Sequence, residues 1–423
     1  MGSSFTTLSM LLPCMPNGAA LVRQTGARAA APGCGRLRAT AGSRAHYSRS
    51  SSKQGGRRAS SSDLPLFYND VYRVELPRGH RFPMEKYRLV REGLQAELGD
   101  AASFAVSPVA TPEDLCTTHD RDYVERYVEG RFTDRENRTV GFPWSERSVK
   151  RSLSSVGGTI GAMHAVCAGG ELRDRLAGTG RSPPPPLFAG HIAGGTHHAF
   201  FSRGEGFCVF SDIAVAANVA LRDYPETIRQ ILIADCDVHQ GNGNAVLFKS
   251  KPTVFTFSIH CKANYFSEKE ESDLDIEVEE GSGDDEYVLL LSESLPALVD
   301  RVRPDLIFYQ GGVDPLEQDR LGRLKLTREG LRRRNRLMYE TALARGIPTV
   351  ITMGGGYPRD LDPGSECFMQ IVRCHQDVYA DAAACIEGSA YLGGGQGSSV
   401  SGSFSADSRN RGSSEPGEVA RRW

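Results

Sequence analysis

The sequence predicts an α/β protein in which a mostly parallel central sheet lies between two layers of helices. Between about residues 65 and 385, short apolar runs are repeatedly followed by a glycine-rich loop and then by a segment of helical periodicity. The runs are apolar at consecutive positions, which is typical of parallel strands covered on both faces. Strands and helices that alternate in this way build a three-layer α/β domain. The chain of 423 residues, 39% of them hydrophobic, is long enough for one large domain of this kind.

Five buried strands follow from these runs, with helices between them. The strands are predicted at residues 187–192, 231–234, 253–260, 306–310 and 349–353. Helical patterns cover residues 213–221 and 328–344, and Thr327 is the expected N-cap of the second helix. That helix contains the basic run LRRRNR at residues 331–336, which we expect to form a solvent-exposed face.

Both ends of the chain differ in composition from the middle, so we expect the folded domain to span residues 63–386. Residues 1–62 contain nine Arg or Lys and no Asp or Glu, which is typical of an organelle transit peptide for a mitochondrion or plastid. The alternative is a disordered basic tail on a nuclear or cytoplasmic protein. Residues 387–423 are rich in Gly and Ser and are expected to be disordered.

The charge of the remaining chain indicates no nucleic-acid partner. Residues 63–423 carry 41 basic and 52 acidic side chains, a net charge of −11. No apolar run approaches the length of a membrane span. The ten cysteines are scattered singly, which favours reduced thiols over a disulfide framework or zinc ribbon. The oligomeric state is not predicted.

The sequence ILIADCDVHQGNG, residues 231–243, places polar side chains at the end of a buried strand. Because side chains alternate along a strand, Asp235, Asp237 and His239 point to the same face. Two carboxylates in an apolar layer repel each other unless a cation lies between them. An Asp oxygen with a His nitrogen suits zinc or a similar divalent metal. The alternative is a strand end capped by an Asx turn, with a histidine packed in the core.

Other strand ends carry the remaining groups that a hydrolytic metal site needs. A catalytic zinc takes three protein ligands, and Asp314, which follows the strand at 306–310, is the candidate third ligand. His197 and His198 are candidates for proton transfer. Tyr357, which follows three glycines, is placed to donate its hydroxyl to a developing oxyanion. Each feature alone is weak, but the ordered set is specific.

This set resembles the histone deacetylase family, which has the arginase/deacetylase fold. The resemblance covers roughly residues 65 to 385 and rests on six motifs: LPRGHRFPMEKYRLVRE (76–92), GFPWSERSVKRS (141–152), AGGTHHAFFSRGEGFCVFSDIAVAA (193–217), DCDVHQGNG (235–243), QGGVDPLEQDRLG (310–322) and GGGYPRD (354–360). The wording HQGNG and GFPWSE is similar to the class IV branch with its bacterial and plant relatives.

The resemblance implies a role for each matching position. Asp237, His239 and Asp314 match the zinc ligands. His198 matches the general base and acid, and Tyr357 matches the residue that polarises the acetyl carbonyl. His197 matches the electrostatic partner of the base, backed by Asp235.

Substrate and cation sites are implied as well. Phe207, after Gly206, matches one aromatic wall of the tunnel for the lysine stem, and the opposite wall is expected near Tyr265 or Phe266. The resemblance also implies a structural K⁺ ion, held by Asp235, Asp237, His239 and Ser258.

Two positions depart from the class I enzymes. The residue backing His198 is Asn242 instead of an Asp, so the pKa of this imidazole is expected to be lower than beside a carboxylate. The rim Asp that holds the substrate backbone in class I enzymes is replaced by GFPWSE, which leaves peptide specificity open.

The expected function is zinc-dependent removal of acetyl or longer acyl groups from protein lysine side chains. Three alternatives remain: deacetylation of small acylated amines such as acetylpolyamines, an arginase-like ureohydrolase, and a non-enzymatic interaction protein. The ureohydrolases use two manganese ions and more Asp and His ligands than are found here. The non-enzymatic alternative is disfavoured because every ligand position is occupied.

Overall fold

A single parallel sheet organises the domain in this computed structural model, which describes residues 64–77, 79–168, 186–265 and 268–393. The sheet has eight strands in the order β2-β1-β3-β8-β7-β4-β5-β6, and every neighbouring pair is parallel. Chain segments far apart in sequence therefore end at the same edge of the sheet. The predicted α/β class is confirmed, and the described sheet is wholly parallel instead of mostly parallel.

The five predicted strands are present with boundaries shifted by one residue at most. They are β3 (Phe188–Ile192), β4 (Ile231–Asp235), β5 (Val254–Cys261), β7 (Leu306–Gln310) and β8 (Thr349–Thr352). Three further strands were not predicted: β1 (Leu64–Tyr68), β2 (Ala102–Val106) and β6 (Leu274–Val278). Both β2 and β6 lie at the edges of the sheet and are partly exposed, so their sequences lack a continuous apolar run.

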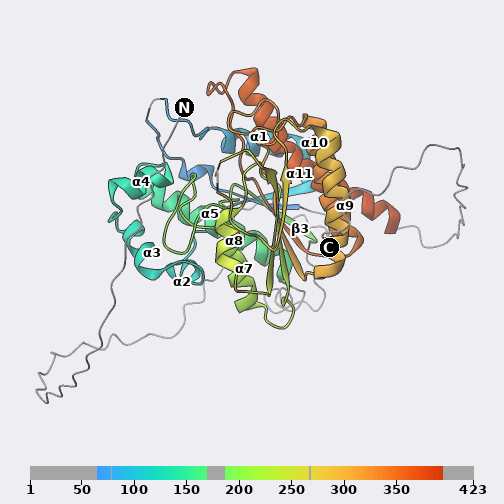
Figure 1. The fold of residues 1–423 in the computed structure, drawn as a ribbon, viewed down its shortest axis with the longest axis horizontal. Coiled ribbons are helices and arrows are strands. Elements are labelled where there is room, and N and C mark those ends of the chain that lie inside the picture. Colours follow the sequence, from blue (N-terminus) through green and yellow to red (C-terminus); the bar gives the residue numbers. More distant parts are fainter. Residues whose placement is uncertain (1–63, 78, 169–185, 266–267, 394–423) are drawn as a thin grey trace, which may run out of the picture. The chain divides into compact units, whose positions relative to one another are not determined.

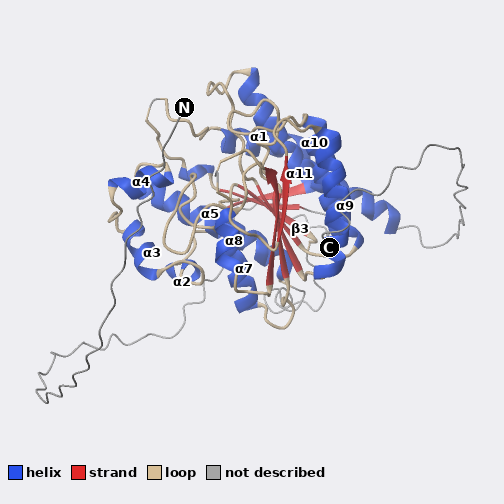
Figure 2. Cartoon of the chain, viewed as in Figure 1, coloured by secondary structure: helices blue, strands red, loops and turns tan. Residues whose placement is uncertain are grey.

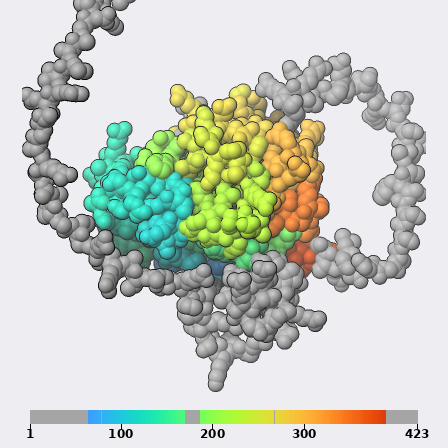
Figure 3. Space-filling view, turned by 90° about the horizontal axis from the view of Figure 1, so that it is seen from below, coloured from blue at the N-terminus to red at the C-terminus, as the bar shows by residue number. Residues whose placement is uncertain are grey.

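Helices cover both faces of the sheet (Figures 1 and 2). On one side lie α1 (Lys86–Leu98), α9 (Asp284–Val302), α10 (Arg328–Ala344) and α11 (Glu366–Gly393). The other side carries α2 (Pro112–Leu115), α3 (Arg121–Val128), α4 (Asp134–Val140), α5 (Glu146–Cys167), α7 (Asp212–Asp223) and α8 (Asn242–Phe248). Two short 3₁₀ helices, Asp70–Tyr72 and Gly99–Ala101, complete the described elements. Figure 3 shows the teal surface of the N-terminal helices bordering the yellow-green surface of α7 and α8.

Alternate residues of each central strand enter different hydrophobic cores. Leu232 and Ala234 of β4 pack toward the helices α1, α9, α10 and α11. Ile231 and Ile233 pack toward α5 and α7 on the opposite face. Both sets are almost fully buried, which explains why the strand is apolar at every position. Polar residues can follow only where the strand leaves this sandwich, at its carboxyl end.

The helix α10 confirms one expectation and contradicts another. Thr327 is its N-cap, and the hydroxyl of Thr327 accepts a hydrogen bond from the Gly330 amide. The run at residues 331–336 is not a solvent-exposed face, because Leu331, Arg334 and Asn335 are buried. Helical periodicity turns these three side chains toward the sheet and leaves Arg332, Arg333 and Arg336 at the surface, where each pairs with a carboxylate.

The chain stays helical beyond the predicted C-terminal boundary of the domain. Helix α11 continues to Gly393, past the boundary placed at residue 386. The predicted transit peptide and the rest of the C-terminal tail lie outside the described residues. The eight described cysteines are free thiols, four of them buried. Among the described helices, none has the length and apolar character required to cross a bilayer.

Candidate active site

The predicted catalytic residues lie together because their four strands are neighbours in the sheet. In spatial order β3, β8, β7 and β4 are adjacent and parallel, so the loops that follow them meet at one edge. His197 and His198 follow β3, Tyr357 follows β8, and Asp314 follows β7, while Asp237 and His239 follow β4. The convergence expected from sequence is therefore observed.

Three buried side chains form a group that could hold a metal ion. One ligand atom from each of Asp237, His239 and Asp314 lies within 4.8 Å of the others. Nδ1 of His239 is 3.1 Å from Oδ1 of Asp237 and 3.2 Å from Oδ2 of Asp314. The second oxygen of each aspartate is held by a backbone amide, Gly355 N–H for Asp237 and Val238 N–H for Asp314.

The electrostatics and packing of this group fit a divalent cation. Burial and then the neighbouring Asp237 raise the pKa of Asp314 to about 6, since two carboxylates share an enclosed site. A bound cation removes this conflict. A Cβ atom at Gly355 would lie 2.1 Å from Oδ2 of Asp314, and one at Gly312 would lie 2.3 Å from Oδ2 of Asp237, so only glycine leaves room for the carboxylates. Two oxygen donors and one imidazole nitrogen suit zinc.

The histidine pair beside this group is electrically asymmetric. Nδ1 of His197 lies 2.6 Å from Oδ2 of Asp235. Burial alone would lower the pKa of His197, but the carboxylates of Asp235 and Asp237 outweigh it and raise the pKa to about 9. Burial and the charges of His197 and His239 hold the pKa of His198 well below its usual range. His198 is therefore the neutral imidazole of the pair and the one able to accept a proton.

A loop that is fixed at several points presents Tyr357. Its amide donates to Oδ2 of Asp319 at 2.6 Å. The ammonium of Lys86, buried among aromatic rings, donates to the Gly356 carbonyl at 3.0 Å and lies 5.3 Å from the Tyr357 ring. Burial and then the charges of Asp237 and Asp314 raise the pKa of Tyr357 well above its ordinary value. Its hydroxyl is therefore protonated at neutral pH and available as a hydrogen-bond donor.

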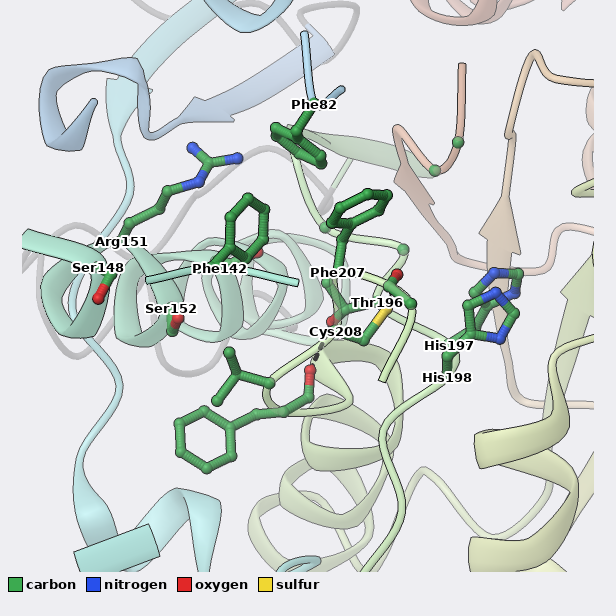
Figure 4. A pocket seen from close by; sticks show the side chains of 18 of the residues that line it. Phe82, Phe142, Ser148, Arg151, Ser152, Thr196, His197, His198, Phe207 and Cys208 are labelled. Atoms are coloured by element: carbon green, nitrogen blue, oxygen red, sulfur yellow. Dashed lines mark hydrogen bonds between the residues drawn. The ribbon is translucent and has the colours of Figure 1, made fainter. Parts of the chain in front are cut away.

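A cavity of about 820 Å³, including its open mouth, connects these groups with the surface. Figure 4 shows Phe82, Phe142 and Phe207 gathered between the histidine pair and helix α5. The Phe82 and Phe207 ring centroids are 5.1 Å apart, and those of Phe207 and Tyr357 are 5.9 Å apart. The cavity thus has aromatic walls and a polar floor.

Of the predicted tunnel residues, Gly206 and Phe207 line this cavity. Both have positive φ, 58° and 68°, which is unusual for a phenylalanine and is held by the bond from Phe207 N–H to the Val140 carbonyl at 2.8 Å. The predicted opposite wall, Phe266, lies outside the described residues, and Tyr265 is largely exposed. Phe82 and Phe142 were not predicted as walls, since their motifs lie far away in the sequence.

The four residues assigned to a potassium ion lie close together at the ends of neighbouring strands. Asp235 pairs with Ser258 in the register of β4 and β5, and the Ser258 hydroxyl contacts Nδ1 of His260 at 2.9 Å. Nothing among the described residues tests whether a cation binds here, so this site stays a prediction.

Two residues that support the metal ligands were not predicted from the sequence. Nε2 of Gln310 donates to Oδ2 of Asp237 at 2.8 Å. Arg334 is completely buried and donates to three carbonyls, those of Cys236 at 3.2 Å, Gly312 at 2.5 Å and Gly311 at 3.2 Å. These carbonyls precede Asp237 and Asp314 in the chain. One guanidinium therefore ties together the two segments that supply the metal ligands.

We expect Arg334→Lys to weaken zinc binding about 10- to 100-fold, the usual effect of losing an outer contact that orients metal ligands. A lysine ammonium is a single point donor and cannot replace a planar fork across three carbonyls. Chelator competition on the purified protein measures this affinity, and a thermal melt checks that the variant is folded.

The matched control is Arg333→Lys on the same helix, whose side chain is exposed and pairs with Asp285. It is expected to bind zinc as the unaltered chain does. Equal zinc affinity in both variants would remove Arg334 from the support of the site.

Comparisons with known proteins agree with this arrangement. Residues 80–373 match the family model of the histone deacetylase domain. An uncharacterized protein of Picosynechococcus is 40% identical over 318 residues, covering 75% of this chain and 99% of the relative. Histone deacetylase 2 of Arabidopsis thaliana is 32% identical over 309 residues, 70% of this chain and 75% of the relative. Histone deacetylase 14, chloroplastic, of the same plant is 29% identical over 229 residues, 52% of this chain and 53% of the relative.

The family match includes all of the catalytic positions described above. A parallel sheet whose adjacent strand ends present an Asp-His-Asp group, two histidines and a tyrosine agrees with that match. On these grounds the chain belongs to the histone deacetylase family.

Proposed function

We propose that the protein is a zinc-dependent hydrolase that removes acetyl groups from lysine side chains. The observation that carries the proposal is the group of Asp237, His239 and Asp314, of which Asp237 and His239 line the same cavity as His198 and Tyr357. Membership in a family of deacetylases supports the hydrolytic chemistry.

Each residue has a distinct task in this mechanism. Bound zinc would supply Lewis acidity to the carbonyl and to a water molecule. His198, neutral in its buried setting, takes a proton from that water during attack and returns it to the leaving amine. His197, kept positive by Asp235, stabilises the negative charge that develops. Tyr357 donates its hydroxyl to the developing oxyanion.

The aromatic walls favour an extended aliphatic substrate arm. The faces of Phe82, Phe142 and Phe207 would pack against the methylene stem of a lysine and exclude water from it.

Next to helix α5, on the far side of the aromatic walls from the histidine pair, the cavity is polar, which favours a short acyl group. Figure 4 shows Ser148, Arg151 and Ser152 along helix α5, and Ser155 lines the same cavity. Nη1 of Arg151 is buried without a hydrogen-bond partner in the described structure. A long fatty chain placed against these groups would desolvate them without compensation, whereas an acetyl group is too small to cover them.

A second candidate function is the deacetylation of small acylated amines such as acetylpolyamines. The net charge of −11 over residues 63–423 favours it, because an acidic body attracts polycations. The loop of residues 141–146 offers Trp144 at the surface where class I enzymes are expected to hold a peptide backbone. We also propose that the protein belongs to the class IV-like branch and that it binds a structural potassium ion.

The basic N-terminal segment and a relative named chloroplastic together favour a plastid. In that compartment the substrates would be acetylated plastid proteins instead of histones. Fusion of residues 1–62 to a fluorescent protein tests this, and diffuse nuclear or cytoplasmic signal would contradict it.

The function is tested by assaying the zinc-loaded protein on one lysine peptide that carries acetyl, butyryl or myristoyl groups, with acetylspermidine as the competing substrate. We expect the highest kcat/KM for the acetyl peptide and a decline with chain length. Faster turnover of acetylspermidine would favour the small-amine function, and release of no amine from any substrate would contradict both.

A further inference from the structure

An amide bridges the catalytic base and a glutamate that the family match does not explain. Nδ1 of His198 lies 2.7 Å from Oδ1 of Asn242. Nδ2 of the same amide donates to Oε1 of Glu205 at 3.2 Å. The three side chains thus form a continuous chain from imidazole to amide to carboxylate.

The orientation of the Asn242 amide follows from its neighbours. The Glu205 carboxylate accepts at this contact, so the NH₂ group of Asn242 faces it. The Asn242 oxygen then faces His198 and the backbone N–H of Gly243, which lies 2.9 Å from Oδ1 and also donates to the His197 carbonyl at 3.0 Å. Because Oδ1 can only accept, Nδ1 of His198 carries the proton and Nε2 keeps its lone pair. This is the tautomer that a general base requires.

Glu205 is placed by a tight turn that packs directly on the base. The Cys208 N–H donates to the Glu205 carbonyl at 2.9 Å, and both central residues, Gly206 and Phe207, have positive φ. This combination defines a type I′ turn, which glycine favours. A Cβ atom at Gly206 would lie 2.7 Å from Cδ2 of His198, so the turn leaves no space between them. The turn fixes both the tunnel wall and the glutamate.

The glutamate is sheltered but keeps a cationic neighbour. Its side chain is 16% exposed, and the mostly exposed Arg203 has its Nε 4.0 Å from Oε2. This oxygen is not the one that meets Asn242, so the two contacts do not compete.

We propose that Glu205 is a positioning residue that acts on His198 through the Asn242 amide. It fixes the amide against rotation and therefore fixes the tautomer of His198. By accepting a hydrogen bond from the amide, it also polarises the Asn242 oxygen, which strengthens the bond to the imidazole once that ring gains a proton. The negative charge that class I enzymes place beside this histidine is here moved one amide away. The effect of Glu205 on catalysis rests on the proposed function.

The decisive experiment exchanges the amide of Asn242 and the carboxylate of Glu205. Glu205→Ala is expected to lower kcat on the acetyl-lysine peptide about three- to tenfold with KM changed less than about twofold, the scale of the net contribution of one typical hydrogen bond. Asn242→Asp is expected to lower kcat as well, because it sets two carboxylates against each other at the 3.2 Å contact. The double variant Asn242→Asp with Glu205→Gln restores an amide–carboxylate pair in reverse order.

We expect this double variant to exceed Asn242→Asp alone by at least about threefold in kcat, although Glu205→Gln lowers kcat in the otherwise unaltered chain. If Glu205 contributed only to packing, Glu205→Gln would not lower kcat in the unaltered protein and raise it in the Asn242→Asp variant. The matched control is Glu271→Gln, an exposed carboxylate of the neighbouring loop that pairs with Lys249, which is expected to leave kcat and the double-variant gain unchanged. If the Asn242→Asp and Glu205→Gln losses simply add, the proposal is wrong.

A second readout separates this proposal from the function. Nitrogen-15 NMR of histidine side chains in the full-length zinc-loaded protein reports the His198 tautomer without any substrate. We expect His198 to be entirely in its Nδ1–H form in the unaltered protein. In Glu205→Ala we expect a mixture of the Nδ1–H and Nε2–H forms. The same single form in Glu205→Ala would overturn the positioning role. A protein that shows the tautomer change but hydrolyses no acyl amine would keep the positioning role and lose the proposed function.

Discussion

Replacing Asp314 by alanine is expected to remove both zinc and activity. Asp314 is fully buried and supplies one of three ligand atoms that lie within 4.8 Å of one another. With two protein ligands left, a catalytic zinc site loses its coordination shell. We expect kcat to fall by at least about a hundredfold, because the bound cation is the main source of charge stabilisation at the carbonyl. Elemental analysis of the purified variant measures the metal, and the acetyl-lysine assay measures the activity.

A control for this variant is Asp360→Ala, which removes an exposed carboxylate of the loop after β8. It is expected to keep one zinc per chain. Full metal content in Asp314→Ala would contradict the ligand assignment, even if activity were lost.

The second large effect is expected for Tyr357→Phe, which removes a single hydroxyl. Loss of one donor to a developing oxyanion typically costs about 100- to 1,000-fold in kcat, and we expect at least tenfold here. The ring that packs beside Phe207 and Lys86 is kept, so zinc content and folding are expected to be unchanged. Steady-state kinetics on the acetyl-lysine peptide, with parallel zinc analysis, measure both. Near-normal turnover would remove Tyr357 from the mechanism.

Tyr224 provides the comparison for that variant, because its hydroxyl contacts Nδ1 of His164 and the residue does not line the cavity. Tyr224→Phe deletes a hydroxyl outside the candidate active site, so kcat is expected to stay within about twofold.

The central strands were predictable because burial on both faces leaves a direct mark on the sequence. The strand Ile231–Asp235 is apolar until its last residue, since only there does the chain leave the sandwich. Strand β6, Leu274–Val278, carries Asp275 and Glu277 at the sheet edge and reads as a loop. Its identity as a strand comes from pairing with β5, which is a tertiary property.

The metal ligands were predictable for a related reason, and their supporting residues were not. Strand β4 ends at Asp235, and the bend after it keeps Asp237 and His239 close by, because each of their amides donates to the aspartate two residues earlier. Arg334, by contrast, shares the inward face of α10 with Leu331 and Asn335, but the sequence does not show which groups it meets there. Only the packing of α10 on the sheet buries it beneath the ends of β4 and β7.

The same limit applies to Glu205. It is separated by 37 residues from Asn242, and the sequence contains no periodic pattern that joins them. The contact between Glu205 and the histidine base through Asn242 depends on how β3 and β4 are ordered in the sheet.

The most direct test of the site is X-ray diffraction from crystals of the full-length protein grown with zinc, recorded on both sides of the zinc absorption edge. The anomalous signal is expected at one position, with oxygen of Asp237, Nδ1 of His239 and oxygen of Asp314 each at about 2.0 to 2.2 Å. A zinc peak at another position would contradict the catalytic assignment. The absence of a zinc peak between these three side chains would contradict it as well.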